Sequence, residues 1–362
     1  MFAADAVARL SGTVGVAAVT AGPGLTNTVT AVKNAQMAQS PLLLIGGAAA
    51  GLLKGRGALQ DIDQMSLFKP ICKYCASVRT VRDIAPTLRT ALAAAQSGTP
   101  GPVFVEFPID TLYPYALVAK EVGATPEAKT LVQRVVNWYL DNYLNNLFAG
   151  AFDPMESRPL KVNIPFVGGD VVRRCAALVA ASRRPVVVVG SQATLPPTPA
   201  GELRKALESL GVPCFLGGMA RGLLGPASPI QMRQRRRDAL KEADLIILAG
   251  AVCDFRLSYG RGLSRKAKII AVNRNKEQLY QNSDMFWKPT VAALGDVGTF
   301  LRDLAANLCH DYTPDPDWLA ALRERDAEKE DANRKMAEEA PPQHLNPLKV
   351  GRAHLGHMED DS

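Results

Sequence analysis

Histidine is scarce in this chain of 362 residues. There are only four histidines, and all of them lie at or beyond His310. Histidine is the side chain most often used for acid–base catalysis near neutral pH, so a histidine-centred enzyme is disfavoured. The sequence also lacks the motifs of P-loop nucleotide hydrolases, HExxH zinc proteases and GxSxG serine hydrolases. Difficult chemistry would therefore have to come from a bound cofactor.

Cysteine is too sparse to define a disulfide framework. The chain has six cysteines, and Cys72 and Cys75 form its one CxxC pair. A structural zinc site would need a second such pair or a histidine pair at matching spacing, and a redox motif would need a thioredoxin-like context. We interpret the pair as packing in or beside the core, and we predict no metal ligands.

Long apolar runs are missing as well. The longest candidate, Pro41–Leu53, contains glycines and is shorter than the ~18–20 apolar residues of a membrane-spanning helix. The segment Met1–Asp5 does not have the form of a signal peptide. It reads as the middle of a helix with no capping residue before it. We therefore predict no membrane segment and expect a chain that is truncated at its start.

The excess of positive charge is small. Lys and Arg number 42 against 35 Asp and Glu, a formal net charge of +7, and the densest basic run is Arg233–Arg237. A nucleic-acid surface would need a wider basic face with interleaved aromatic residues, whereas Asp238, Glu242 and Asp244 follow this run. We interpret the run as a solvated helix face and predict no nucleic-acid partner.

Short apolar runs alternate with helical segments in the N-terminal part of the chain. The runs Val14–Thr20, Leu42–Ile45 and Val103–Phe107 predict buried strands. Helices are predicted between and around them at Phe2–Leu10, Leu25–Gln39 and Asp83–Ala95. Strands and helices in this order are typical of a parallel sheet with helices on both faces.

The same alternation returns in the C-terminal part. Strands are predicted at Pro185–Val189, Pro213–Leu216, Asp244–Leu248 and Lys268–Val272, separated by helices at Val171–Ala181, Gly201–Leu210 and Gln231–Lys241. The sequence thus predicts an α/β fold with two doubly wound parallel-sheet domains. We place the domains at residues 1–112 and 168–310. A linker with a helix at Leu131–Phe148 occupies 113–167, a charged helix at Asp317–Met336 and a connection occupy 311–350, and a tail without apolar periodicity occupies 351–362.

Two polar or glycine-rich segments of the first domain are candidates for ligand contact. The glycine–proline turn Thr20–Asn27 follows a strand and opens a helix, and its glycines leave room for a ligand to approach the backbone. Gly57–Gln64 follows a glycine-rich loop and is dense in hydrogen-bonding side chains. From the residues alone, a tight loop without a ligand is an equally good interpretation of Thr20–Asn27, and an exposed polar turn is slightly favoured for Gly57–Gln64.

Three strand ends of the second domain combine polar side chains with glycines or arginines. They are Gly217–Gly222, Gly250–Arg256 and Val272–Asn275. Ligands of open α/β sheets bind at the carboxyl ends of strands, and arginine suits phosphate groups. The pattern favours a nucleotide site about as strongly as it favours plain fold-forming loops.

In combination these segments resemble thiamine diphosphate-dependent enzymes of the acetolactate synthase type. Five segments follow the pyrimidine-binding domain of that family in order, namely Ala3–Gly12, Thr20–Asn27, Pro41–Leu43, Leu59–Asp63 and Gly101–Val103. Leu59 stands where the family usually has Phe. The second unit resembles the central domain of the family. The segments Trp138–Leu140, Gly217–Gly225 and Val252–Gly260 are similar to the branch that cleaves 2-hydroxyacyl-CoA.

The resemblance implies thiamine diphosphate and Mg²⁺ as cofactors. In this family the cofactor's own aminopyrimidine deprotonates its thiazolium carbon, and the protein contributes orientation and electrostatics. By family position, Pro23, Gly24 and Asn27 would line the pyrimidine, and Gln60 would be the catalytic candidate that points towards the reacting centre. Two arginines, Arg221 and Arg256, would lie near a bound FAD, ADP or CoA in the central domain.

The implied activity is cleavage of a 2-hydroxyacyl-CoA into a shortened aldehyde and formyl-CoA. Two alternatives stay open: an acetolactate synthase that joins 2-keto acids such as pyruvate, and a non-catalytic binding or regulatory chain. Family members assemble as dimers or tetramers, so a homo-oligomer is expected. The resemblance implies the endoplasmic reticulum, while the lack of an anchor or signal in these residues leaves a cytoplasmic location open.

Two parts of the family pattern have no counterpart in these residues. The glutamate that activates the pyrimidine precedes the first matched helix, and neither Asp5 nor Glu106 stands at its position. The domain that binds the diphosphate through magnesium would follow Val350, where 351–362 looks unrelated to the family. We therefore expect a chain truncated at both ends, with the third domain and its Mg²⁺ site missing, that is inactive by itself.

Overall fold

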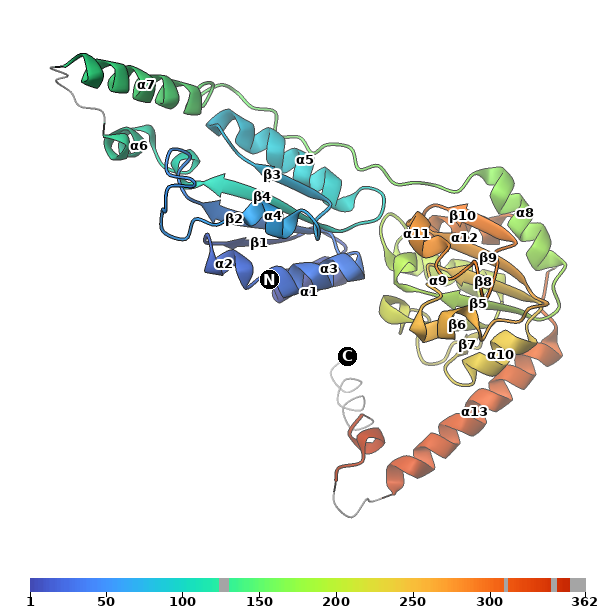
Figure 1. The fold of residues 1–362 in the computed structure, drawn as a ribbon. Helices are drawn as coiled ribbons and strands as arrows, with labels where there is room; N and C mark the ends of the chain where they lie inside the picture. The colour runs from blue at the N-terminus through green and yellow to red at the C-terminus, as the bar shows by residue number, and fades with distance from the viewer. Residues whose placement is uncertain (124–129, 309–311, 340–343, 352–362) are drawn as a thin grey trace. The chain divides into compact units, whose positions relative to one another are not determined.

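The computed structural model describes residues 1–123, 130–308, 312–339 and 344–351, so all but the first residue of the predicted tail at 351–362 lies outside it. The chain forms two compact units, Met1–Ile164 and Pro165–Ser362. Each contains one sheet (Figure 1). Among the described residues, no helix is long and apolar enough to cross a membrane.

The first unit is built on four parallel strands. They are β1 (Gly15–Val19), β2 (Leu42–Ala48), β3 (Tyr74–Ser77) and β4 (Pro102–Pro108), in the spatial order β1-β2-β4-β3. The strand β3 has no counterpart among the sequence predictions, because it is short and half-buried throughout and so carries no apolar run. The carboxyl ends of β1, β2 and β4 lie at one edge of the sheet, which is where a ligand is expected.

Helices cover both faces of this sheet (Figure 1). One face packs against α5 (Ile84–Gln96), and the other packs against α2 (Pro23–Thr26), α3 (Val29–Ala38) and α4 (Gln64–Phe68). The helix α1 (Phe2–Ser11) contacts β1 and α3. The predicted single helix Leu25–Gln39 is wrong in one respect, since it is two helices. The hydroxyl and N–H of Thr28 both donate to the carbonyl of Leu25, which closes the first helix there.

The chain segment that follows β4 carries two helices that pack together. They are α6 (Tyr115–Val122) and α7 (Leu131–Leu147), joined by the apolar cluster of Val118, Leu144 and Leu147. A capping box between Thr130 and Gln133 fixes the start of α7. The helix predicted at Leu131–Phe148 therefore forms, and it belongs to the first unit.

The second unit has six parallel strands in the order β10-β9-β8-β5-β6-β7. Their bounds are β5 (Pro185–Val189), β6 (Cys214–Leu216), β7 (Gln231–Met232), β8 (Leu245–Ala249), β9 (Lys268–Asn273) and β10 (Val291–Leu294). The chain runs outwards from β5 to β7 and then returns to place β8 on the other side of β5. This reversal is the topological switch point of a doubly wound sheet, beside which such folds bind nucleotides. The predicted α/β class with parallel sheets is confirmed.

Helices again sandwich the sheet. One core contains α8 (Gly169–Ala180), α9 (Ala200–Leu210) and α12 (Val297–Ala306), and the other contains α10 (Arg236–Glu242), α11 (Lys276–Leu279) and the start of α13 (Pro316–Glu338). The helix predicted at Gln231–Lys241 is wrong over its first half. Gln231 and Met232 pair with β6 as β7, and Arg235 has a φ of +54°, so the helix begins only at Arg236.

Candidate functional site

The glycine–proline turn lies against the polar segment that follows the glycine-rich loop. Gly22 has a φ of +61°, and a Cβ added there would lie 2.9 Å from the Cβ of Gln60 and 3.0 Å from its carbonyl oxygen. Only glycine combines this backbone conformation with so close an approach. The structure thus brings together the two segments of the first unit that the sequence singled out separately.

A buried glutamine fixes the turn from behind. The N–H of Gly22 donates to Oε1 of Gln64 at 2.9 Å. Nε2 of Gln64 donates to the carbonyl of Gly47 at 3.0 Å and to Oε2 of Glu106 at 2.9 Å. Gln64 is 2% exposed and Glu106 is 0% exposed, so these bonds form without competition from water. They tie β1, β2 and β4 together at their carboxyl ends.

Glu106 anchors the glycine-rich loop as well. Its Oε1 accepts from Ser77 Oγ at 2.9 Å and from Lys54 Nζ at 2.6 Å. A buried carboxylate is tolerated when it is paired and hydrogen-bonded, and here it has three donors. In the sequence, Gln64 was marked only as the end of the polar segment Gly57–Gln64, Glu106 was only excluded as the activating glutamate, and Lys54 was not marked. One sequence signal could have pointed to Glu106, because it is a single acidic residue inside the apolar strand Val103–Phe107.

The face of the turn that points away from this network is open. Pro23, Asn27 and Gln60 are exposed and Gly24 is half-buried. Among the described residues, no hydrogen-bond partner is found for the side-chain amides of Asn27 and Gln60. Each can therefore donate to and accept from a bound molecule. A proline surface beside two available amides fits a flat heteroaromatic ring with polar edges.

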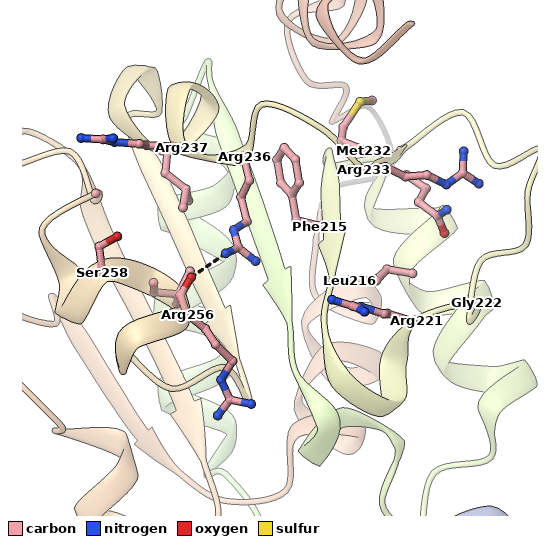
Figure 2. A pocket seen from close by; sticks show the side chains of 14 residues that line it. Phe215, Leu216, Arg221, Gly222, Met232, Arg233, Arg236, Arg237, Arg256 and Ser258 are labelled. Atoms are coloured by element: carbon pink, nitrogen blue, oxygen red, sulfur yellow. Dashed lines mark hydrogen bonds between the residues drawn. The ribbon is translucent and has the colours of Figure 1, made fainter. Parts of the chain in front are cut away.

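The second unit has a basic cavity of about 590 Å³ on the carboxyl side of its sheet (Figure 2). Five arginines line it, and no acidic residue does; they are Arg221, Arg233, Arg236, Arg237 and Arg256. They come from the segment after β6, from the β7–α10 region and from the segment after β8. We call this space the arginine cavity. Its position beside the switch point and its charge suit a phosphorylated ligand.

Two guanidinium groups of the arginine cavity, those of Arg221 and Arg236, act on each other electrostatically. Figure 2 shows the side chain of Arg221 extending toward Arg236, while the guanidinium of Arg256 points away from both. Arg236 donates to the carbonyl of Arg256 at 2.6 Å, and its pKa is lowered by burial and by the positive charge of Arg221. Arg256 is held by Asp254 at 2.5 Å, and that hydrogen bond raises its pKa. No protein partner is found for the guanidinium of Arg221 among the described residues. An incoming anion would relieve the repulsion between the guanidinium groups of Arg221 and Arg236.

Two sequence interpretations of this unit need correction. The basic run 233–237 is not simply a solvated helix face, because Arg233, Arg236 and Arg237 line the cavity. The strand end Val272–Asn275 does not reach the cavity. Arg274 is buried instead, with Nη2 2.5 Å from Oδ2 of Asp296.

The cysteine pair packs against the core of the first unit. Cys72 and Cys75 are half-buried free thiols that pack against the core formed by Leu25, Phe68 and Phe104, among others. Among the described residues, no cluster of three or more His, Cys, Asp or Glu side chains could hold a metal ion.

Both units match domains of one enzyme family. A model of the thiamine pyrophosphate enzyme N-terminal TPP binding domain matches residues 1–67, and a model of the thiamine pyrophosphate enzyme central domain matches residues 172–304. The 2-hydroxyacyl-CoA lyase 2 of Danio rerio is 68% identical over 350 residues, which are 97% of this chain and 56% of that protein.

More distant relatives point the same way. The Homo sapiens protein of the same name is 62% identical over 97% of this chain and 55% of its own length. A probable acetolactate synthase of Mycobacterium bovis is 31% identical over 75% of this chain and 44% of its own length. The chain thus spans about half the length of these lyase relatives. With both domain models matched in order on two parallel α/β units, the chain belongs to the thiamine diphosphate-dependent enzyme family and is a close homologue of 2-hydroxyacyl-CoA lyase 2.

Proposed function

We propose that this protein acts in thiamine diphosphate-dependent carbon–carbon bond cleavage, splitting a 2-hydroxyacyl-CoA into a shortened aldehyde and formyl-CoA. The observation that supports it best is the identity of 62–68% to proteins named 2-hydroxyacyl-CoA lyase 2 across 97% of the chain. The geometry of the two sites is compatible with this chemistry. One offers a surface for a heteroaromatic ring, and the other offers positive charge for phosphates.

The glycine–proline turn would form the pyrimidine-side wall of the cofactor site. Pro23 and Gly24 would contact the ring face, and Asn27 and Gln60 would present amides to the ring edge and the reacting centre. Gln64 and Glu106 hold the turn in place beneath them. When bound, thiamine diphosphate supplies a nucleophilic carbon that attacks a carbonyl or takes up the fragment released on cleavage. The part of these residues is to orient the ring and to exclude water from it.

The arginine cavity would take a diphosphate group. Arg221, Arg236 and Arg256 can each form charge-assisted hydrogen bonds to phosphate oxygens. FAD, ADP and CoA all carry a diphosphate joined to an adenosine, so this chemistry does not separate them. The Mg²⁺ that accompanies thiamine diphosphate in the family is part of the proposal by resemblance alone.

Two other functions remain candidates. The 31% identity to a probable acetolactate synthase supports a carboligase that uses 2-keto acids. A chain that spans about half of its lyase relatives could also act as a binding or regulatory subunit. From the family resemblance we also propose that the protein forms a homo-oligomer and is located at the endoplasmic reticulum. We further propose that residues 1–362 alone do not turn over substrate, because the family's activating glutamate and diphosphate anchor have no counterpart in them.

The test compares substrates and chain lengths. Two proteins are assayed in parallel with thiamine diphosphate and Mg²⁺, each on a 2-hydroxyacyl-CoA and on pyruvate. One is the 362-residue chain. The other carries, in addition, the half that the lyase relatives have and residues 1–362 do not span. Aldehyde from the first substrate only supports the lyase, whereas acetolactate from pyruvate supports the carboligase. Turnover by the 362-residue chain would contradict the proposal that it is inactive by itself.

A further inference from the structure

The first unit has a cavity of its own, beyond the glycine-rich loop. This cavity of about 500 Å³ is bounded by the loop after β2, by the segment after β4 and by helices α6 and α7. We call it the apolar cavity, because aliphatic and aromatic side chains make up most of its wall, including Leu52, Leu53, Ile109, Tyr113, Leu117, Val118 and Val122. Size and composition are those of a small-molecule site.

The walls of the apolar cavity are held together by one buried carboxylate. Asp110 is 5% exposed. Its Oδ2 accepts from the N–H of Gly51 at 2.9 Å and from the hydroxyl of Tyr143. These bonds fix the loop and α7 to the end of β4, and the packing of Val118 on Leu144 fixes α6 to α7. The cavity is therefore formed before any ligand arrives, which lowers the entropic cost of binding.

Its apolar side chains remain partly open to solvent. Leu53 is 53% exposed, Ile109 41%, Tyr113 43% and Leu117 39%. Single exposed apolar residues are ordinary, but several that line one concave surface mark a site for an apolar partner. The cavity contains Asp110 and Glu121 and no basic residue, so phosphate groups would be repelled from it. The ligand portion that it suits is apolar and uncharged.

The apolar cavity and the glycine–proline turn lie at the same edge of the sheet. Gly51 is bonded to Asp110 just after β4, while Lys54, in the same loop, is bonded to Glu106 within β4. Glu106 is bonded in turn to Gln64, which holds Gly22. A single hydrogen-bonded loop thus runs from the apolar cavity to the turn. A molecule reacting at the turn could lay an apolar extension along this loop.

We propose that the apolar cavity binds the alkyl chain of the acyl substrate and so sets the preference for chain length. Leu53, Ile109 and Leu117 contact the methylene groups, and Asp110 and Tyr143 hold the walls. The inference rests on the proposed function, because it takes the substrate to be an acyl compound. The CoA phosphates of such a substrate lie outside this cavity, since its acidic residues disfavour them.

The test uses neutral probes, so that it needs no turnover. Primary alcohols of four to ten carbons are titrated into the 362-residue chain by isothermal calorimetry. The expected affinity rises about two- to fourfold for each added methylene, as burial of a methylene group predicts. Leu117→Asp removes this dependence on length. Leu10→Asp is the matched control, since Leu10 is 82% exposed and lies outside the cavity. Circular dichroism and thermal melting confirm that both variants are folded.

The outcomes separate this inference from the proposed function. Alcohol binding that depends on chain length and is lost only in Leu117→Asp supports the cavity, even if no lyase activity is found. Affinity that does not depend on length, or equal slopes in Leu117→Asp and the native chain, overturns it, even if lyase activity is present. A loss of self-association in Leu117→Asp without alcohol binding would assign this surface to a protein contact and also overturn it.

Discussion

Gln64 and Glu106 are 42 residues apart in the chain and are joined by a buried hydrogen bond of 2.9 Å. The same glutamine accepts from the N–H of Gly22, and the same glutamate accepts from Lys54. One pair of side chains thus fixes both the turn proposed to face the cofactor and the loop that leads to the apolar cavity. The geometry of both features depends on one contact between two side chains that are far apart in the chain.

Replacing Gln64 by leucine should destabilise the first unit. The substitution leaves the N–H of Gly22 and one oxygen of Glu106 buried without their partner, and such a loss costs about 2–4 kcal/mol. Urea unfolding measures the change. Gln60→Leu is the matched control, because Gln60 is exposed and forms no bond to the protein among the described residues, and it should shift stability by less than about 0.5 kcal/mol. Equal effects of the two substitutions would show that the network does not hold the turn.

Gly22→Ala should destabilise more than Gly57→Ala. Both glycines have positive φ angles, +61° and +79°, but a Cβ at Gly22 meets Gln60 while a Cβ at Gly57 meets nothing within 4 Å. A positive φ costs alanine about 1 kcal/mol at either position, and at Gly22 the ψ of −114° and the contact with Gln60 add to that cost. Thermal unfolding of the two variants measures the difference. A larger loss for Gly57→Ala would contradict the close approach.

Arg221→Gln should weaken binding of ADP and CoA about tenfold or more. The reason is the loss of a charge-assisted hydrogen bond from an otherwise unpaired guanidinium. Titration calorimetry at two salt concentrations measures the change. Arg235→Gln removes the same charge from the same unit, but Arg235 does not line the arginine cavity, so its effect should be small. Equal weakening by both substitutions would indicate attraction by net charge alone.

Asp296→Ala should destabilise the second unit by about 3–5 kcal/mol. Arg274 and Asp296 have side chains that are 1% and 0% exposed, so the substitution leaves a buried guanidinium without its counterion. Denaturant unfolding measures the loss. Asp303→Ala, which removes an exposed carboxylate paired with Arg302, is the comparison and should change stability by less than about 1 kcal/mol. A small loss for Asp296→Ala would mean that water reaches the pair.

The local part of the fold could be predicted well from the sequence. Strands such as Pro185–Val189 and Val103–Phe107 are buried on both faces, so they read as continuous apolar runs. The short strands β3, β7 and β10 were missed because their stability comes from neighbouring strands rather than from their own composition. The turn at Thr20–Asn27 was visible because glycine and proline mark backbone conformations directly.

The sequence by itself therefore determined the two parallel α/β units, the glycine–proline turn and the resemblance to a cofactor-dependent family. Tertiary structure decided which side chains meet: Gln64 with Glu106, Arg236 with Arg256, and Asp110 with Gly51 and Tyr143. Local backbone preference acts between residues close in the chain. These contacts join residues brought together only when parallel strands align their carboxyl ends at one edge, and no local pattern records that alignment.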